Sequence, residues 1–153
     1  SQRKKNPNFF LYDEKNRNAK ILVVGDNFGC GSSREHAVWA LMDYGFEVVI
    51  STSFADIFYN NCFKNGLLPI LVNKEEIQNI TTNIDKKNSE FVVNLKNQSI
   101  ICDDFKIIFE IDDRQKEVLL EGIDDISETL KLSDKIKEYE NKKSLKTPWL
   151  FNE

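Results

Sequence analysis

A glycine-rich segment (residues 25–31, GDNFGCG) between an apolar run and a helix-like run constrains the fold of this chain most. Residues 19–25 (AKILVVG) form a short continuous apolar run that ends in glycine, which is typical of a buried strand. Residues 33–44 repeat their apolar side chains at the helical period, and Gly45 supplies a stop. Residues 46–50 form a second apolar run. A strand, a helix and a strand within about 30 residues predict a βαβ unit with parallel strands.

The rest of the chain predicts further α/β structure without an internal repeat. Ser53 is a good N-cap for a helix that ends at Gly66, and a strand over 67–72 is placed at a sheet edge or a strand start because it contains Pro69. We expect one α/β domain over residues 1–153, with a mixed, partly parallel sheet flanked by helices. The remaining predicted elements are a short helix over 74–80, a hairpin of 91–95 and 99–102, a strand over 105–111, helices over 113–121 and 127–143, and a C-terminal tail over 144–153.

Composition and charge argue against several classes of function. The chain of 153 residues carries a formal net charge of −4, which argues against binding nucleic acid through clustered Lys and Arg. No apolar run approaches the roughly 18 residues of a membrane span. An odd count of three cysteines, without a signal peptide, predicts free thiols in a reducing compartment, the cytoplasm. The spacing of the cysteines fits no zinc or iron–sulfur ligand pattern, so we expect no metal to be bound by this chain.

The residues that follow the glycines predict an anion site. Ser32, Ser33 and Arg34 lie at the start of the predicted helix, whose N-terminus favours negative charge. A cation is unfavourable there unless its guanidinium grips a bound carboxylate with two hydrogen bonds, so the pattern predicts a small acidic ligand. Ser32 and Glu35 also form a capping box. The residues alone leave both roles of Ser32 open, as an N-cap and as a proton acceptor.

Other motifs in and beside this segment are weaker. The lysine of a phosphate-binding loop is missing, and the dinucleotide-binding pattern fails at its third glycine. His36, the one histidine, either assists proton transfer or packs as a structural residue. Cys30 is a candidate reactive thiol, whereas Cys62 and Cys102 fit core positions.

Three segments of the sequence resemble one known family. GDNFGCGSSREHAVWAL at 25–41, DYGFEVVI at 43–50 and SFADIFYNNCFKNGLLPI at 53–70 are similar to the small subunits of 3-isopropylmalate dehydratase, in the aconitase superfamily. The resemblance covers at least residues 7–130 and implies an aconitase-type swivelling β/β/α domain. The family's N-terminal segment, several dozen residues long, is not matched before residue 7, which indicates a truncated chain or part of a longer protein.

The resemblance implies a two-subunit hydro-lyase. In that family a 4Fe-4S cluster is held by a separate large subunit, and its open iron acts as a Lewis acid. The implied partners are therefore the large subunit, in a heterodimer or a higher assembly, and a small hydroxy-dicarboxylate substrate, with no nucleic acid and no membrane. The implied reaction interconverts 2-isopropylmalate and 3-isopropylmalate by dehydration and rehydration in leucine biosynthesis. Two alternatives stay open: the small subunit of a related hydro-lyase acting on citraconate, methylmalate or homoaconitate, and a non-catalytic carboxylate-binding module.

The resemblance also implies roles for single residues. In the family, the first serine of the Ser-Ser-Arg run removes the carbon-bound proton, and the arginine binds a substrate carboxylate. An unassisted hydroxyl is a poor base, and a guanidinium beside a helix start is the group that stabilises its alkoxide. Carried over, Ser32 and Arg34 are catalytic, Asn27, Gly31, Ser33 and Arg34 bind substrate, and Glu35 and His36 support the site.

Overall fold

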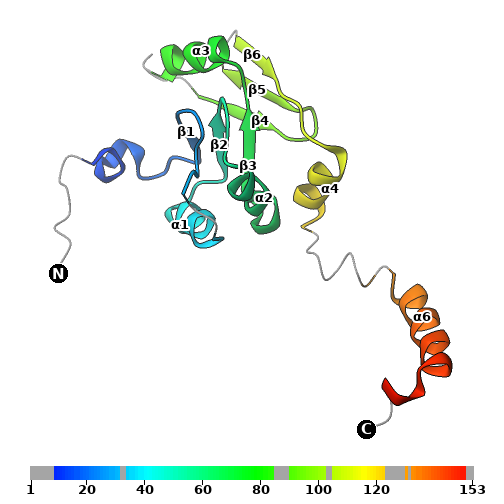
Figure 1. Ribbon diagram of the computed structural model, residues 1–153. Helices are drawn as coiled ribbons and strands as arrows, with labels where there is room; N and C mark the ends of the chain where they lie inside the picture. Colours follow the sequence, from blue (N-terminus) through cyan, green and yellow to red (C-terminus); the bar gives the residue numbers. More distant parts are fainter. Residues whose placement is uncertain are drawn as a thin grey trace, which may run out of the picture.

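Strands and helices alternate through the first half of the chain in the computed structural model, which describes residues 9–31, 34–84, 90–102, 105–122, 130 and 132–150 (Figure 1). The strands are β1 (Ile21–Val23), β2 (Val48–Ser51), β3 (Leu68–Leu71), β4 (Val92–Asn94), β5 (Ser99–Cys102) and β6 (Phe105–Ile108). The α-helices are α1 (His36–Tyr44), α2 (Asp56–Asn65), α3 (Lys74–Ile84), α4 (Asp113–Glu121) and α6 (Ser133–Lys146). Short 3-10 helices are η1 (Phe10–Tyr12), η2 (Glu14–Asn16) and η3 (Pro148–Leu150).

The first three strands form a parallel sheet in the order β1-β2-β3. Ile21 pairs with Val48, and Val48 pairs in turn with Leu68. All four residues of the central strand β2 are buried, as expected of a strand covered on both faces. The predicted βαβ unit is therefore confirmed. Pro69, which lacks an N–H, lies in β3 at the edge of the described sheet, where the sequence placed it.

The last three strands form a separate antiparallel sheet in the order β4-β5-β6. Val92 pairs with Ile101, and Ile101 pairs with Lys106, so the predicted hairpin is confirmed and extended by a third strand. The α/β class and the mixture of strand directions are as expected, with one difference. We expected parallel and antiparallel strands in one sheet, whereas the two kinds of pairing belong to two sheets. Local sequence patterns report the direction of neighbouring strands, but not whether two groups of strands share an edge.

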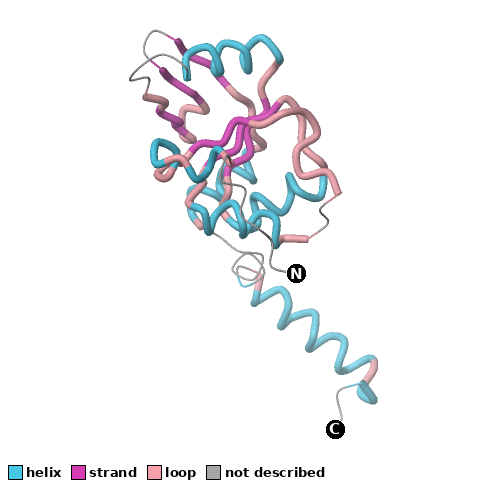
Figure 2. Tube along the Cα trace, turned by 90° about the vertical axis from the view of Figure 1, so that its left-hand side faces the viewer, coloured by secondary structure: helices cyan, strands magenta, loops and turns pink. Residues whose placement is uncertain are grey.

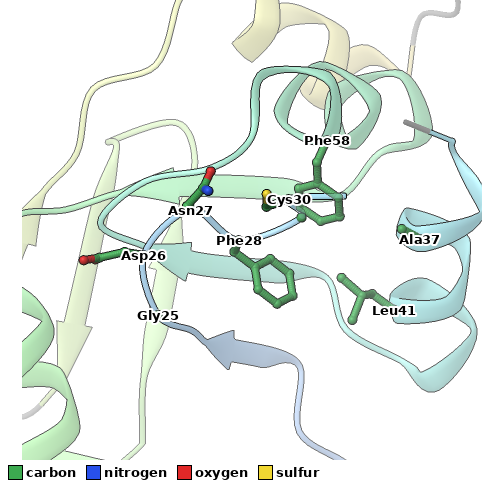
Figure 3. Close-up of a pocket in the computed structure, with 9 residues that line it drawn as sticks. Gly25, Asp26, Asn27, Phe28, Cys30, Ala37, Leu41 and Phe58 are labelled. Atoms are coloured by element: carbon green, nitrogen blue, oxygen red, sulfur yellow. The ribbon is translucent and has the colours of Figure 1, made fainter. Parts of the chain in front are cut away.

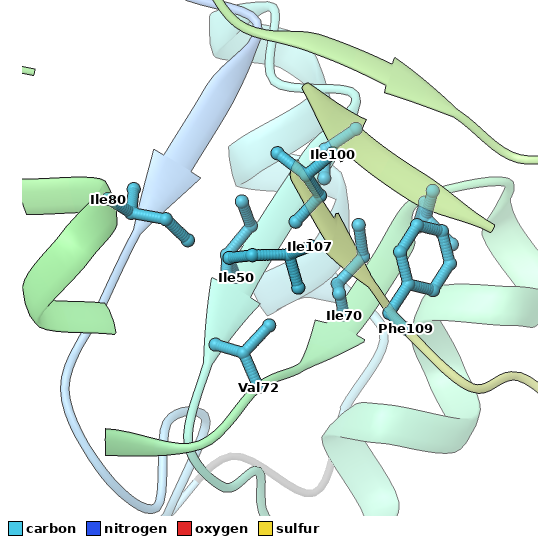
Figure 4. Packing of buried hydrophobic residues seen from close by; sticks show 9 residues of the cluster. Ile50, Ile70, Val72, Ile80, Ile100, Ile107 and Phe109 are labelled. Atoms are coloured by element: carbon cyan, nitrogen blue, oxygen red, sulfur yellow. The ribbon is translucent and has the colours of Figure 1, made fainter. Parts of the chain in front are cut away.

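The parallel sheet lies between the helices α1 and α2 on one face and the second sheet on the other. Alternate residues of a strand point to opposite faces, so Val49 faces one way and Ile50 the other. Val49 packs with Val38 of α1 and Phe58 of α2. On the opposite face, Ile50 packs with a cluster that includes Ile70, Ile100, Ile107 and Phe109 (Figure 4). The result is a helix layer and two sheet layers, in agreement with a β/β/α domain.

Several element ends differ from the sequence-based prediction. α1 begins at His36 rather than near residue 33, and α3 continues to Ile84 rather than ending at residue 80. α2 is preceded by Ala55, with no side-chain cap, so Ser53 is not its N-cap. The Ser53 hydroxyl instead accepts a hydrogen bond from the backbone amide of Asn27. The predicted glycine stops are confirmed, because Gly45 and Gly66 both adopt left-handed conformations after α1 and α2.

The helix α6 lies apart from both sheets in the two overall views (Figures 1 and 2). It packs against η3 at its C-terminal end. The predicted start of this helix, residue 127, falls outside the described residues, and α6 continues to Lys146, beyond the residue 144 where we placed a tail. Within the described part of the chain, no helix is both long and apolar enough to cross a membrane.

Candidate functional site

The glycine loop (residues 25–31) leaves the carboxyl end of β1 and runs beside the carboxyl end of β2 (Figure 3). In open α/β sheets, ligands bind outside the carboxyl ends of the strands. Phe28 forms a parallel bridge with Phe54, so the loop begins as a short strand-like continuation of the sheet. The fold thus carries the loop to the edge where α/β proteins hold their ligands.

Left-handed backbone conformations recur along the loop. Asn27 has φ 53°, Gly29 has φ 82° and Gly31 has φ 81°. At Gly29 a glycine is required for a second reason, because a Cβ there would lie 2.2 Å from Cγ of the buried Phe58 ring. Gly31 has open space around it, so its requirement is conformational alone. The loop is therefore shaped by backbone conformation and by close contact with α2.

A pocket of about 450 Å³ lies between the loop, α1 and α2. Its apolar walls come from Phe28, Ala37, Leu41 and Phe58, and Asn27 adds a polar group (Figure 3). Phe28 meets Phe58 edge-on, with ring centroids 5.3 Å apart, which fixes the aromatic wall. The described part of the site thus combines an apolar hollow with exposed polar backbone.

The predicted site residues fall in and next to this loop. Ser32 and Ser33 lie outside the described residues, so neither role of Ser32 is tested. Arg34 is exposed and precedes α1 instead of lying in its first turn, because the helix begins at His36 with Glu35 as the preceding residue. Glu35 makes no side-chain cap, and the predicted helix start within the capping box is therefore wrong.

His36 contacts Trp39 one helical turn later. The two ring centroids are 4.7 Å apart, and the Trp39 indole Nε1 donates a 2.6 Å hydrogen bond to Asn65 Oδ1 at the end of α2. Both rings lie on the exposed side of α1. The packing interpretation of His36, the proton-transfer interpretation and its supporting role at the site all stay predictions.

Sequence reasoning missed the polar residues that follow β2. The hydroxyl of Ser53 accepts a 2.7 Å hydrogen bond from the Asn27 amide, and the Thr52 hydroxyl bonds to the Asp26 carboxylate. Ser51 is fully buried, and its hydroxyl donates a 2.8 Å hydrogen bond to the Gly25 carbonyl oxygen. A Ser-Thr-Ser run at the carboxyl end of a buried parallel strand was the available signal, since ligands bind at that edge of such sheets.

The three cysteines occupy three separate places. Cys30 is exposed in the glycine loop, whereas Cys62 on α2 and Cys102 on β5 are buried, as predicted. Burial raises the pKa of the Cys62 thiol to about 12, which keeps it protonated and unreactive. Burial, followed by the neighbouring Cys62 and Asp112, raises the pKa of Tyr59 on the same helix. In the ranges that the structure describes, no group of three or more His, Cys, Asp or Glu side chains is placed to hold a metal ion.

Comparison with known proteins gives one consistent family. Residues 1–76 match the aconitase C-terminal domain, and residues 125–153 match the C-terminal domain of the 3-isopropylmalate dehydratase small subunit. The chain is 52% identical over 147 residues to a 3-isopropylmalate dehydratase small subunit of Xanthobacter autotrophicus, covering 95% of this chain and 73% of that protein. A small subunit of Azorhizobium caulinodans is 53% identical over the same shares.

A solved structure agrees with the sequence comparisons. The crystal structure of a 3-isopropylmalate dehydratase from Methanocaldococcus jannaschii superposes with a TM-score of 0.60 at 32% identity, covering 85% of this chain and 74% of that one. Both the sequence and the arrangement of strands and helices are therefore shared. The chain belongs to the family of 3-isopropylmalate dehydratase small subunits.

Proposed function

We propose that this chain is the small subunit of a 3-isopropylmalate dehydratase and that it acts with a large subunit. The pair interconverts 2-isopropylmalate and 3-isopropylmalate by removing and restoring water, through 2-isopropylmaleate. The observation that carries the proposal is the glycine loop at the carboxyl ends of β1 and β2, followed in the sequence by Ser32, Ser33 and Arg34, in a chain about half identical to known small subunits. Dehydration of a hydroxy-dicarboxylate needs a carboxylate clamp and a proton acceptor side by side, and this stretch of sequence supplies both.

The proposed roles follow from the chemistry of each group. Ser32 removes the proton from carbon, and the Arg34 guanidinium binds a substrate carboxylate with two hydrogen bonds. The Arg34 guanidinium and the backbone amides of the loop lower the free energy of the Ser32 alkoxide. The other proposed contacts are Asn27, Gly31 and Ser33 to substrate, with Glu35 and His36 as supporting residues.

The 4Fe-4S cluster of this superfamily is assigned to the large subunit in our proposal. The cysteines of this chain do not fit a cluster site, because they lie in the glycine loop, on α2 and on β5, and two of them are buried. No step of the proposed mechanism on this chain passes through the cluster. Three free thiols also support the proposal that the protein works in the reducing cytoplasm.

Reconstitution tests the proposed function. The chain is mixed anaerobically with a cluster-bearing large subunit, and the unsaturated isopropylmaleate intermediate is followed by ultraviolet absorbance. We expect activity from the pair and none from either chain alone. Turnover of citraconate, methylmalate or homoaconitate in place of isopropylmalate contradicts the proposed substrate. Saturable carboxylate binding without turnover, in a pair that associates, contradicts catalysis.

Replacing Ser32 tests the proposed base. In the reconstituted pair, Ser32→Ala is expected to lower kcat by at least about 10²-fold, the loss typical of a missing general base. Ser144→Ala on α6, which also removes one hydroxyl, serves as the control and is expected to retain full activity. Activity within a few-fold of the wild type in Ser32→Ala contradicts the role of Ser32 and leaves the family assignment untouched.

A further inference from the structure

The 51–55 segment, which comprises the last residue of β2 and the four residues after it, contacts the first part of the glycine loop. The Phe28 amide donates a 3.1 Å hydrogen bond to the Ser53 carbonyl oxygen, and the Ala55 amide donates a 2.9 Å bond to the Phe28 carbonyl oxygen. These two bonds form the parallel bridge between Phe28 and Phe54. Asn27, the residue before Phe28 in the loop, adopts a left-handed conformation.

We propose that Ser53 is a positioning residue of the isopropylmalate site, which rests on the function proposed above. Its hydroxyl accepts the Asn27 amide proton at 2.7 Å and so holds the peptide where the loop turns toward Gly31 and Arg34. Left-handed backbone is unfavourable for most residues with a Cβ, although less so for Asn, and the bond to Ser53 stabilises Asn27 in this conformation. The Ser53 hydroxyl thus holds Asn27, a proposed substrate contact, in the conformation with which the loop continues to Gly31.

The Ser53 hydroxyl serves the loop and not its own helix. An N-cap lies immediately before the first helical residue, and Ala55 holds that position before Asp56, so Ser53 lies two residues outside it and α2 has no side-chain cap. The Ser53 hydroxyl instead accepts a hydrogen bond from the Asn27 amide, 26 positions earlier in the chain. The polar group of Ser53 thus makes a long-range contact with the candidate site.

Ser53 is itself held by the buried Ser51. The Ser53 amide donates a 3.2 Å hydrogen bond to the Ser51 hydroxyl, which lies 2.8 Å from the carbonyl oxygens of both Gly25 and Ser53. A single hydroxyl proton is therefore shared between the loop and the 51–55 segment. Because Ser51 has no exposed surface, water cannot replace it, and Ser53 is presented to Asn27 in one orientation.

The activity test compares three variants in the complex with the large subunit. Ser53→Ala is expected to lower kcat by about 10-fold or more, because a small displacement of reacting groups is costly in rate. Its affinity for the large subunit is expected to stay within about twofold, and its thermal midpoint within about 4 °C, the shift of one lost hydrogen bond. Ser53→Thr keeps the hydroxyl and is expected to restore kcat to within about threefold. Ser99→Ala, at a buried serine of β5, is the control with unchanged kcat.

Amide exchange in the isolated chain separates this inference from the proposed function. The Asn27 amide is expected to exchange at least about 10-fold faster in Ser53→Ala than in the wild type, and at the wild-type rate in Ser99→Ala. An inactive wild-type pair contradicts the proposed function, while this exchange measurement still decides whether Ser53 holds the loop. If Ser53→Ala does not fold, Ser53→Cys keeps the size with a weak acceptor and is expected to show the same changes. Unchanged exchange and unchanged kcat overturn the inference, as does a kcat loss that Thr does not rescue.

Discussion

At the scale of single residues, the proposed site is expected to depend on groups that no similar side chain replaces without loss, and Arg34, the proposed carboxylate clamp, is the first of these. Lysine keeps the positive charge but loses the planar fork that binds a carboxylate with two hydrogen bonds. We expect Arg34→Lys to lower kcat/KM of the reconstituted pair by roughly 10²-fold. Arg17→Lys, beyond η2, is the matched control and is expected to have wild-type kinetics. Equal kinetics for both variants contradict the carboxylate clamp.

Alanine substitutions at Gly29 and Gly31 distinguish the cost of lost close packing from the cost of backbone strain. Both have φ near 80°, but only at Gly29 does a Cβ collide with the buried Phe58 ring. We expect Gly29→Ala to lower the free energy of unfolding by about 2–4 kcal/mol and Gly31→Ala by about 1 kcal/mol, measured by urea denaturation of the isolated chain. Equal losses at the two positions contradict the packing of the loop on α2.

At the scale of elements, α2 carries an ionisable group whose burial links stability to alkaline pH. In the unfolded chain the Cys62 thiol titrates near pH 8.5, whereas burial raises its pKa to about 12 in the folded protein. Between these values the unfolded chain has lost a proton that the folded chain still binds, so stability falls as pH rises. Below about pH 8.5 the thiol is protonated in both states and contributes no pH dependence.

Unfolding of two cysteine variants between pH 8 and pH 11 measures this linkage. We expect Cys62→Ala to flatten the alkaline loss of stability relative to the wild type, whatever its effect at pH 7. Cys30→Ala removes an exposed thiol from the glycine loop and is expected to keep the wild-type slope. If the free energy of unfolding of Cys62→Ala depends on pH as it does in the wild type, the pKa of this thiol does not differ between the folded and the unfolded chain.

The elements also show what sequence patterns can and cannot predict. The apolar run over 19–25 and the periodic run before Gly45 predicted the βαβ unit correctly, because both signals are local. The start of α1 was wrong because Ser32 and Glu35 have the spacing of a capping box, whereas the helix begins at His36. Ser53 looked like an N-cap for the same reason, but its hydroxyl bonds across 26 positions to Asn27. Long-range partners of this kind leave no mark in the neighbouring residues.

At the scale of the whole molecule, α6 contributes little to the layers that hold the site. The helix packs against η3 and lies apart from both sheets in Figures 1 and 2. We expect a chain ending at Gly122 to keep slow amide exchange in β2, β3 and β5, because their buried neighbours are all retained. Loss of that protection in the shortened chain contradicts the separation of α6 from the core.

The packing of the glycine loop against residues 51–58 orders events during synthesis of the chain. The loop leaves the ribosome first, but the groups that shape it come later: the Ser53 hydroxyl for the Asn27 amide and the Phe58 ring for Gly29. Until residue 53 has emerged and β2 has formed, the Asn27 amide lacks its Ser53 partner. The loop is therefore completed only after the segment that follows it in the sequence, so its folding depends on residues synthesised later than itself.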